Sequence, residues 1–129
     1  MADVKSRVLI VEDDDQYRDF LAELLGLSGY HIQTAVNGKD GLVQFENFEP
    51  NLVITDLVMP EVEGIEMLQR LRKQKSDVPV IVLSGGNRGD ANSYLKAADM
   101  LGAIKTFKKP VDNGELLKAV ESILLQGAV

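Results

Sequence analysis

Hydrophobic residues along this chain fall into two kinds of segment that alternate. Continuous apolar runs occupy residues 7–11 (RVLIV), 51–55 (NLVIT) and 79–83 (PVIVL), with weaker runs at 31–36 (HIQTAV) and 104–107 (IKTF). Short continuous apolar runs are typical of strands that are buried on both faces, as in parallel sheets. The two weaker runs are expected at the edges of the sheet.

The segments between and after these runs have helical spacing. Apolar residues recur at intervals of three or four in segments 17–25, 42–45, 65–71, 91–101 and 116–124. Asp112 and Glu115 stand before the last segment at the spacing of a capping box, with Asp in the place of the usual Ser or Thr. The pattern therefore predicts five successive strand–helix units.

Alternating strands and helices predict an α/β fold in which right-handed crossovers connect parallel strands. At 129 residues the common arrangement is a flavodoxin-like (βα)5 doubly wound five-stranded sheet of order 2-1-3-4-5, in three α/β/α layers. We expect residues 1–129 to form a single domain with a core from about residue 7 to residue 125. Ligands in this fold bind beyond the carboxyl ends of the strands, near the first and third strands.

Composition narrows the class of protein. The chain lacks cysteine and has one histidine, His31, which excludes disulfides and zinc sites built from several Cys or His side chains. Its net charge of −6 disfavours non-specific binding to nucleic acid. It contains no apolar stretch near the roughly 20 residues that span a bilayer, and no signal-type run at its N-terminus. We therefore expect a cytoplasmic protein that binds neither membrane nor nucleic acid.

Polar side chains follow the predicted strands. Glu12 and Asp13 follow the first strand, Asp56 the third, Ser84 the fourth and Lys109 the fifth. Because the carboxyl ends of parallel strands meet at one edge of a sheet, these side chains are expected around one concavity. Three clustered carboxylates repel one another, and a hard divalent cation relieves this repulsion. Mg²⁺ is favoured over Zn²⁺ because every available ligand atom is oxygen.

The same residues suit phosphoryl chemistry. A carboxylate can act as a nucleophile toward a phosphoryl group and form an acyl phosphate. Lys109 and Ser84 are suited to bind the phosphoryl oxygens, the ammonium as a point charge and the hydroxyl as a hydrogen-bond donor. Asp14 and Asp15 are expected to cap the first helix and to complement its dipole.

The chain resembles the receiver domain of two-component response regulators over essentially its whole length. The resemblance rests on the motifs VLIVEDD, ITDLVMPEVEG, VLSGG and FKKP, each at the end of a predicted strand. It implies that Asp56 accepts a phosphoryl group from a sensor histidine kinase or a histidine phosphotransfer protein. It also implies that Asp13, Asp56 and the backbone carbonyl of Val58 bind Mg²⁺, for which Mn²⁺ can substitute, and that Glu12 acts mainly through water.

The resemblance assigns further roles near the last two strands. Ser84 takes the position of the conformational-switch hydroxyl, Lys109 that of the phosphate-binding lysine, and the Lys109–Pro110 bond is a candidate cis peptide. Thr106 stands where many receivers carry an aromatic switch residue, which leaves the mechanism of the switch open. The segment from Ser84 to Gly102 is longer than in typical receivers, so the helix within it is expected to start late.

A receiver is a signalling module and not an enzyme, apart from self-phosphotransfer and slow autodephosphorylation. Phosphorylation is expected to switch the surface of the fourth helix, fifth strand and fifth helix toward an unknown downstream protein, or toward a second copy in a dimer. We expect a stand-alone receiver, with a receiver cut from a longer regulator or a hybrid kinase as the alternative.

Three other functions fit the sequence less well. A phosphatase of the haloacid dehalogenase type needs a second Asp two residues after the nucleophile, where this chain has Val58. A flavodoxin-like redox carrier needs a phosphate-binding loop after the first strand, where this chain has four acids. A receiver that signals without phosphate would lack one of the acids or the lysine, and all are present.

Overall fold

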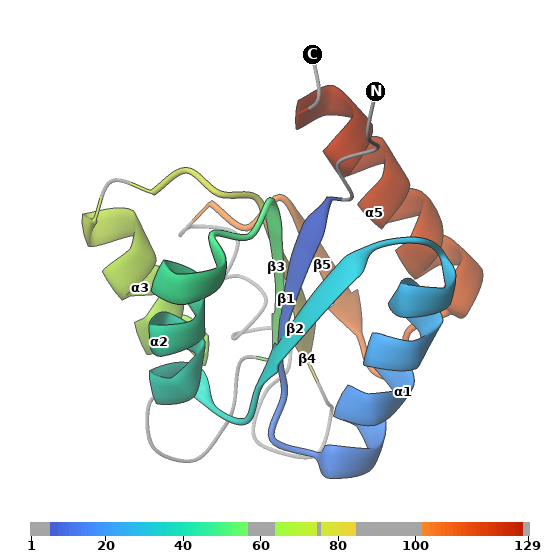
Figure 1. Cartoon of the computed structure of the whole chain (residues 1–129), viewed down its shortest axis with the longest axis horizontal. Coiled ribbons are helices and arrows are strands. Elements are labelled where there is room, and N and C mark those ends of the chain that lie inside the picture. The colour runs from blue at the N-terminus through green and yellow to red at the C-terminus, as the bar shows by residue number, and fades with distance from the viewer. Residues whose placement is uncertain (1–5, 57–63, 75, 85–101, 128–129) are drawn as a thin grey trace.

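The computed structural model describes residues 6–56, 64–74, 76–84 and 102–127, whose centre is a five-stranded parallel sheet (Figure 1). The strands lie in the order β2-β1-β3-β4-β5. Their bounds are Arg7–Val11 for β1, His31–Ala35 for β2, Leu52–Asp56 for β3, Val80–Ser84 for β4 and Lys105–Lys108 for β5. The order and the parallel pairing confirm the flavodoxin-like fold that the sequence predicts.

Helices cover both faces of this sheet. α1 (Asp15–Leu27) and α5 (Asn113–Gly127) lie on one face, and α2 (Gly38–Phe48) and α3 (Gly64–Lys73) lie on the other (Figure 1). The helix expected over residues 91–101, and the long segment before it, lie outside the described residues. None of the helices in the described part is long and apolar enough to cross a membrane.

The sheet separates two hydrophobic cores because successive side chains of a strand point to opposite faces. Leu9 and Val11 of β1 pack in the core that includes residues of α3, whereas Val8 and Ile10 pack in the core that includes residues of α1 and α5. Burying a side chain of this size stabilises the fold by about 1.5–3 kcal/mol. Burial on both faces explains why β1, β3 and β4 read as continuous apolar runs. β2 and β5 are the edge strands and are more exposed, as their weaker patterns predict.

Short polar side chains fix the starts of α1 and α5. Asp14 is the N-cap of α1, and its Oδ1 accepts hydrogen bonds from the backbone N–H groups of Gln16 and Tyr17. Asp112 Oδ1 accepts a hydrogen bond of 2.9 Å from the backbone N–H of Glu115 at the start of α5. These contacts satisfy N–H groups that a helix cannot satisfy internally. They confirm the predicted capping role of Asp14.

Candidate functional site

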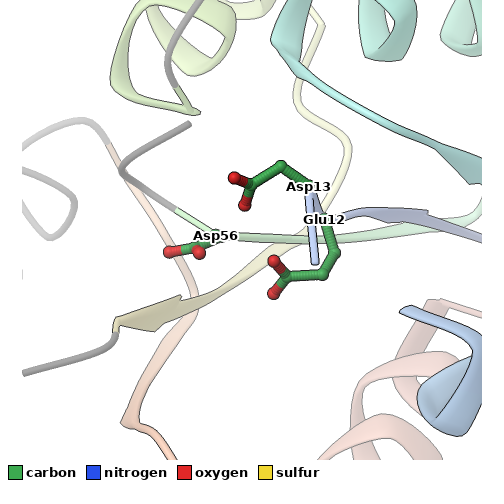
Figure 2. A group of neighbouring side chains, drawn as sticks. All are labelled: Glu12, Asp13 and Asp56. Carbon is green, nitrogen blue, oxygen red and sulfur yellow. The ribbon is translucent and has the colours of Figure 1, made fainter. Parts of the chain in front are cut away.

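The carboxyl ends of β1 and β3 bring three carboxylates together. Glu12 and Asp13 directly follow β1, and Asp56 is the last residue of β3. One oxygen atom from each side chain lies within 4.8 Å of the other two, and Figure 2 shows the three side chains converging. Glu12 and Asp56 are buried and Asp13 is half-buried. The structure thus places the three predicted acids in one cluster.

Lys109 enters the same cluster from the turn after β5. Its Nζ donates hydrogen bonds to Glu12 Oε1 and, at 2.9 Å, to Asp56 Oδ2. Its backbone N–H donates to the carbonyl oxygen of Ser84 at 2.8 Å, which joins the ends of β4 and β5. Ser84 is buried at the end of β4, and the Lys109–Pro110 peptide bond is cis, as the resemblance implies.

The ammonium of Lys109 contacts two carboxylates, and the pKa values of Lys109 and Glu12 respond differently to this shared contact. Burial raises the pKa of Glu12 above its ordinary value of 4.5, although hydrogen bonds from Lys109 and from the Asp14 N–H oppose the change. Burial lowers the pKa of Lys109, but its hydrogen bonds to Glu12 and Asp56 outweigh burial, and the net pKa is raised. Two carboxylates stabilise the charged form of Lys109, whereas Glu12 shares the ammonium with Asp56. Among the described residues, one ammonium faces the three carboxylates of Glu12, Asp13 and Asp56, so negative charge exceeds positive charge in this cluster.

The donor atoms of the cluster fit a hard divalent cation. Glu12, Asp13 and Asp56 offer only carboxylate oxygens, which Mg²⁺ and Mn²⁺ prefer and which suit softer metals less. A cation would also neutralise the excess negative charge. The backbone carbonyl of Val58, the further ligand that the resemblance implies, lies outside the described residues.

Two residues of α1 contact the site and escaped prediction from the sequence. Arg18 Nη1 donates to the backbone oxygen of Glu12 at 3.0 Å, and its Nη2 donates to Asp15 Oδ1 at 2.6 Å. The ring of Tyr17 lies beside Lys109, with Nζ 4.9 Å from the ring centroid. Apolar spacing indicates that Tyr17 is part of the core. The contact of Tyr17 with the site could have been predicted from its place in the first helical turn after β1, close to the strand ends.

Thr106 and Phe107 lie on opposite faces of β5, as strand alternation predicts. Thr106 pairs with Val82, whose side chain belongs to the core that includes residues of α3. Phe107 packs against the other core, and Lys105 Nζ lies 5.8 Å from its ring centroid. No aromatic side chain of β5 therefore occupies the face on which Thr106 lies.

Comparisons with known proteins show the family to which the chain belongs. The chain matches the response regulator receiver domain over residues 8–121. It is 35% identical over 120 residues to a probable transcriptional regulator, ycf27, of Cyanophora paradoxa, covering 93% of this chain and 48% of the relative. It is 33% identical over 120 residues to the DNA-binding dual master transcriptional regulator RpaA of Synechocystis, covering 92% of this chain and 48% of the relative. The chain thus spans about half the length of these curated relatives.

A solved structure shows the same architecture. The receiver domain of the Francisella response regulator 1452 superposes with a TM-score of 0.85 at 25% sequence identity. The match covers 95% of this chain and 99% of that one.

Proposed function

Because this chain belongs to the response regulator receiver domain family, we propose that it accepts a phosphoryl group on Asp56 in a Mg²⁺-dependent reaction. The observation that carries the proposal is the meeting of Asp56, Glu12, Asp13 and Lys109 at the carboxyl end of the sheet. A nucleophile, two further acids and a fixed ammonium are the groups that phosphoryl transfer to a carboxylate requires.

Asp56 is the proposed nucleophile. One carboxylate oxygen attacks the phosphorus of the donor, an O–P bond forms, and the P–N bond of a phosphohistidine or the P–O bond of acetyl phosphate breaks. The electron pair of the broken bond leaves with the donor, and Asp56 becomes an acyl phosphate. Lys109 already contacts Asp56 Oδ2, so its ammonium is placed to bind the phosphoryl oxygens as charge moves onto them. The Ser84 hydroxyl is the proposed second donor to those oxygens.

Asp13 and Asp56 are the proposed direct ligands of the cation, together with the backbone carbonyl of Val58. Bound Mg²⁺ would neutralise negative charge on the carboxylates and on the phosphoryl oxygens. Glu12 is the proposed indirect ligand, acting through water. This assignment is supported by the hydrogen bonds that Glu12 already accepts from Lys109 and from the Asp14 N–H.

The proposed phosphodonor is a sensor histidine kinase or a histidine phosphotransfer protein. A cytoplasmic location is proposed with it, in keeping with family membership. Phosphorylation is proposed to alter a protein-binding surface that includes β5 and α5, with Thr106 in the place of the usual aromatic residue. The receiver itself is proposed to bind protein and not nucleic acid, since its net charge is −6. Because the named relatives are transcriptional regulators about twice as long, a receiver joined to a DNA-binding segment is the alternative to a stand-alone protein.

Intact-mass spectrometry tests the acceptor. After incubation with acetyl phosphate and Mg²⁺, the wild-type chain should gain the mass of one phosphoryl group. Asp56→Asn should gain none. Asp77→Asn, which removes an exposed acid from a loop before β4, should label like the wild type. An unlabelled wild type, or a labelled Asp56→Asn, would overturn the proposal.

A further inference from the structure

The ring of Tyr17 forms one side of the environment of Lys109. Lys109 Nζ lies 4.9 Å from the ring centroid, within the range of about 6 Å over which an aromatic face attracts a cation. The same Nζ donates hydrogen bonds to Glu12 and Asp56. The ammonium is therefore held by two carboxylates and by one aromatic ring.

The ring is itself fixed by the protein. Asp14 caps the backbone N–H of Tyr17 at 3.2 Å, so the residue is anchored in the first turn of α1. Its side chain packs against the core that includes residues of α1 and α5, and it stacks with Phe20 at a centroid separation of 6.3 Å. A flexible lysine loses rotamer freedom when it is held in one place. A fixed ring can favour one orientation of that lysine before any ligand arrives.

The contact with Lys109 involves the ring and not the phenol oxygen. Among the described residues the buried hydroxyl of Tyr17 has no hydrogen bond of standard geometry. The nearby Val111 N–H lowers the pKa of Tyr17, but by less than burial raises it. Burial is the main influence and raises the pKa of Tyr17 above 10.0, so the side chain is neutral at physiological pH. Phenylalanine should therefore reproduce the contact.

We infer that Tyr17 is a positioning residue for Lys109: its ring holds the ammonium toward Asp56 so that the phosphoryl group meets a preorganised cation. The functional half of this inference rests on the proposed phosphorylation of Asp56. The structural half, in which the ring fixes the lysine, stands independently of that reaction.

NMR tests the structural half without phosphodonor or Mg²⁺. Ring current should shift the ε-methylene protons of Lys109 upfield in the wild type and in Tyr17→Phe. The shift should be lost in Tyr17→Leu and kept in Tyr30→Leu, the matched control that removes a half-buried ring packed against the same core. An unshifted lysine in the wild type, or a shift that survives in Tyr17→Leu, would overturn the inference.

The rate of labelling by acetyl phosphate tests the functional half. Tyr17→Leu should slow labelling by about ten-fold, while Tyr17→Phe and Tyr30→Leu should remain within about two-fold of the wild type. Fluorinated phenylalanines at position 17 keep the shape of the ring but weaken its negative face, so the rate should fall with each added fluorine. This series decides the question even if Tyr17→Leu does not fold. A rate independent of fluorination would overturn the inference, whereas a wild type that never labels would instead overturn the proposed function.

Discussion

Glu12 and Lys109 show how one contact can affect two residues differently. Both side chains are largely buried. Lys109 contacts two carboxylates, and Glu12 and Asp56 share this one lysine. Burial is the largest influence on the pKa of Glu12 and raises it. Burial is also the largest single influence on the pKa of Lys109 and lowers it, but the contacts with Glu12 and Asp56 together outweigh burial, and the net pKa is raised. Their positions after the strands predict that these residues meet. The sharing of the ammonium, and its contact with Tyr17, depend on side-chain rotamers that an apolar pattern does not encode.

The raised pKa of Glu12 predicts a pH dependence of stability in metal-free buffer. A carboxyl whose folded pKa lies above its unfolded value contributes stability below the unfolded value, near 4.5, and loses it as the pH rises through the folded value. The free energy of unfolding of the wild type, relative to Glu12→Gln, should therefore fall as the pH rises through this window. Urea unfolding at a series of pH values measures this difference.

Glu23→Gln is the matched control, because Glu23 is exposed on α1. It removes one carboxyl group from the surface of the same protein, so the pH dependence of Glu12→Gln is read relative to it. If the wild type instead gains stability over Glu12→Gln as the pH rises, the ion pair with Lys109 outweighs burial, and the pKa of Glu12 is lowered and not raised.

At the scale of elements, the sequence predicts the central strands better than the contacts between helices. β1, β3 and β4 are buried on both faces, and their apolar runs leave little ambiguity. Edge strands and helix ends carry weaker signals because solvent accepts many residue types there. The close approach of α2 to β1 and α3 occurs at Gly41, and the spacing of apolar residues does not show it. Only the packed structure shows why a side chain is excluded at this position.

A pair of glycine substitutions tests this packing. A Cβ atom at Gly41 would lie 2.7 Å from Met67 Sδ and 3.1 Å from Val11 Cγ2, both in buried side chains. Gly41→Ala should therefore lower the free energy of unfolding by about 1–2 kcal/mol, since overpacking outweighs the gain in helix propensity. A Cβ at Gly26 in α1 meets nothing within 4 Å, so Gly26→Ala should raise the free energy of unfolding by about 0.5–1 kcal/mol. Equal stabilisation of both variants in urea unfolding would contradict the packing described.

At the scale of the whole molecule, the sheet gathers residues that are distant in sequence into one acidic site. Alternating strands and helices, together with the chain length, predict the order β2-β1-β3-β4-β5, and this order alone places the ends of β1 and β3 side by side. The upstream kinase and the downstream partner are not predictable in this way. Their recognition depends on surface side chains, which neither the topology nor the core constrains.

The acidic site should make the stability of the whole molecule depend on a divalent cation. The proposed Mg²⁺ site exists only in the folded protein, so millimolar Mg²⁺ should raise the melting temperature. Asp13→Asn should lose most of this gain. Asp19→Asn, the same change of charge on the exposed part of α1, should keep it. Thermal melts with Mg²⁺ and with EDTA make the comparison, and an equal gain in all three proteins would mean that the cation acts elsewhere.

The proposed Mg²⁺-dependent phosphorylation is tested most directly by the rate at which Asp56 gains a phosphoryl group from acetyl phosphate as a function of Mg²⁺ concentration. The rate for the wild type and for Asp19→Asn should rise with Mg²⁺, saturate, and fall to background in EDTA. For Asp13→Asn the rate should stay near background at every concentration that saturates the wild type. Labelling of Asp13→Asn at the wild-type rate, or labelling of the wild type that is unaffected by EDTA, would contradict a Mg²⁺-dependent reaction at this acidic cluster.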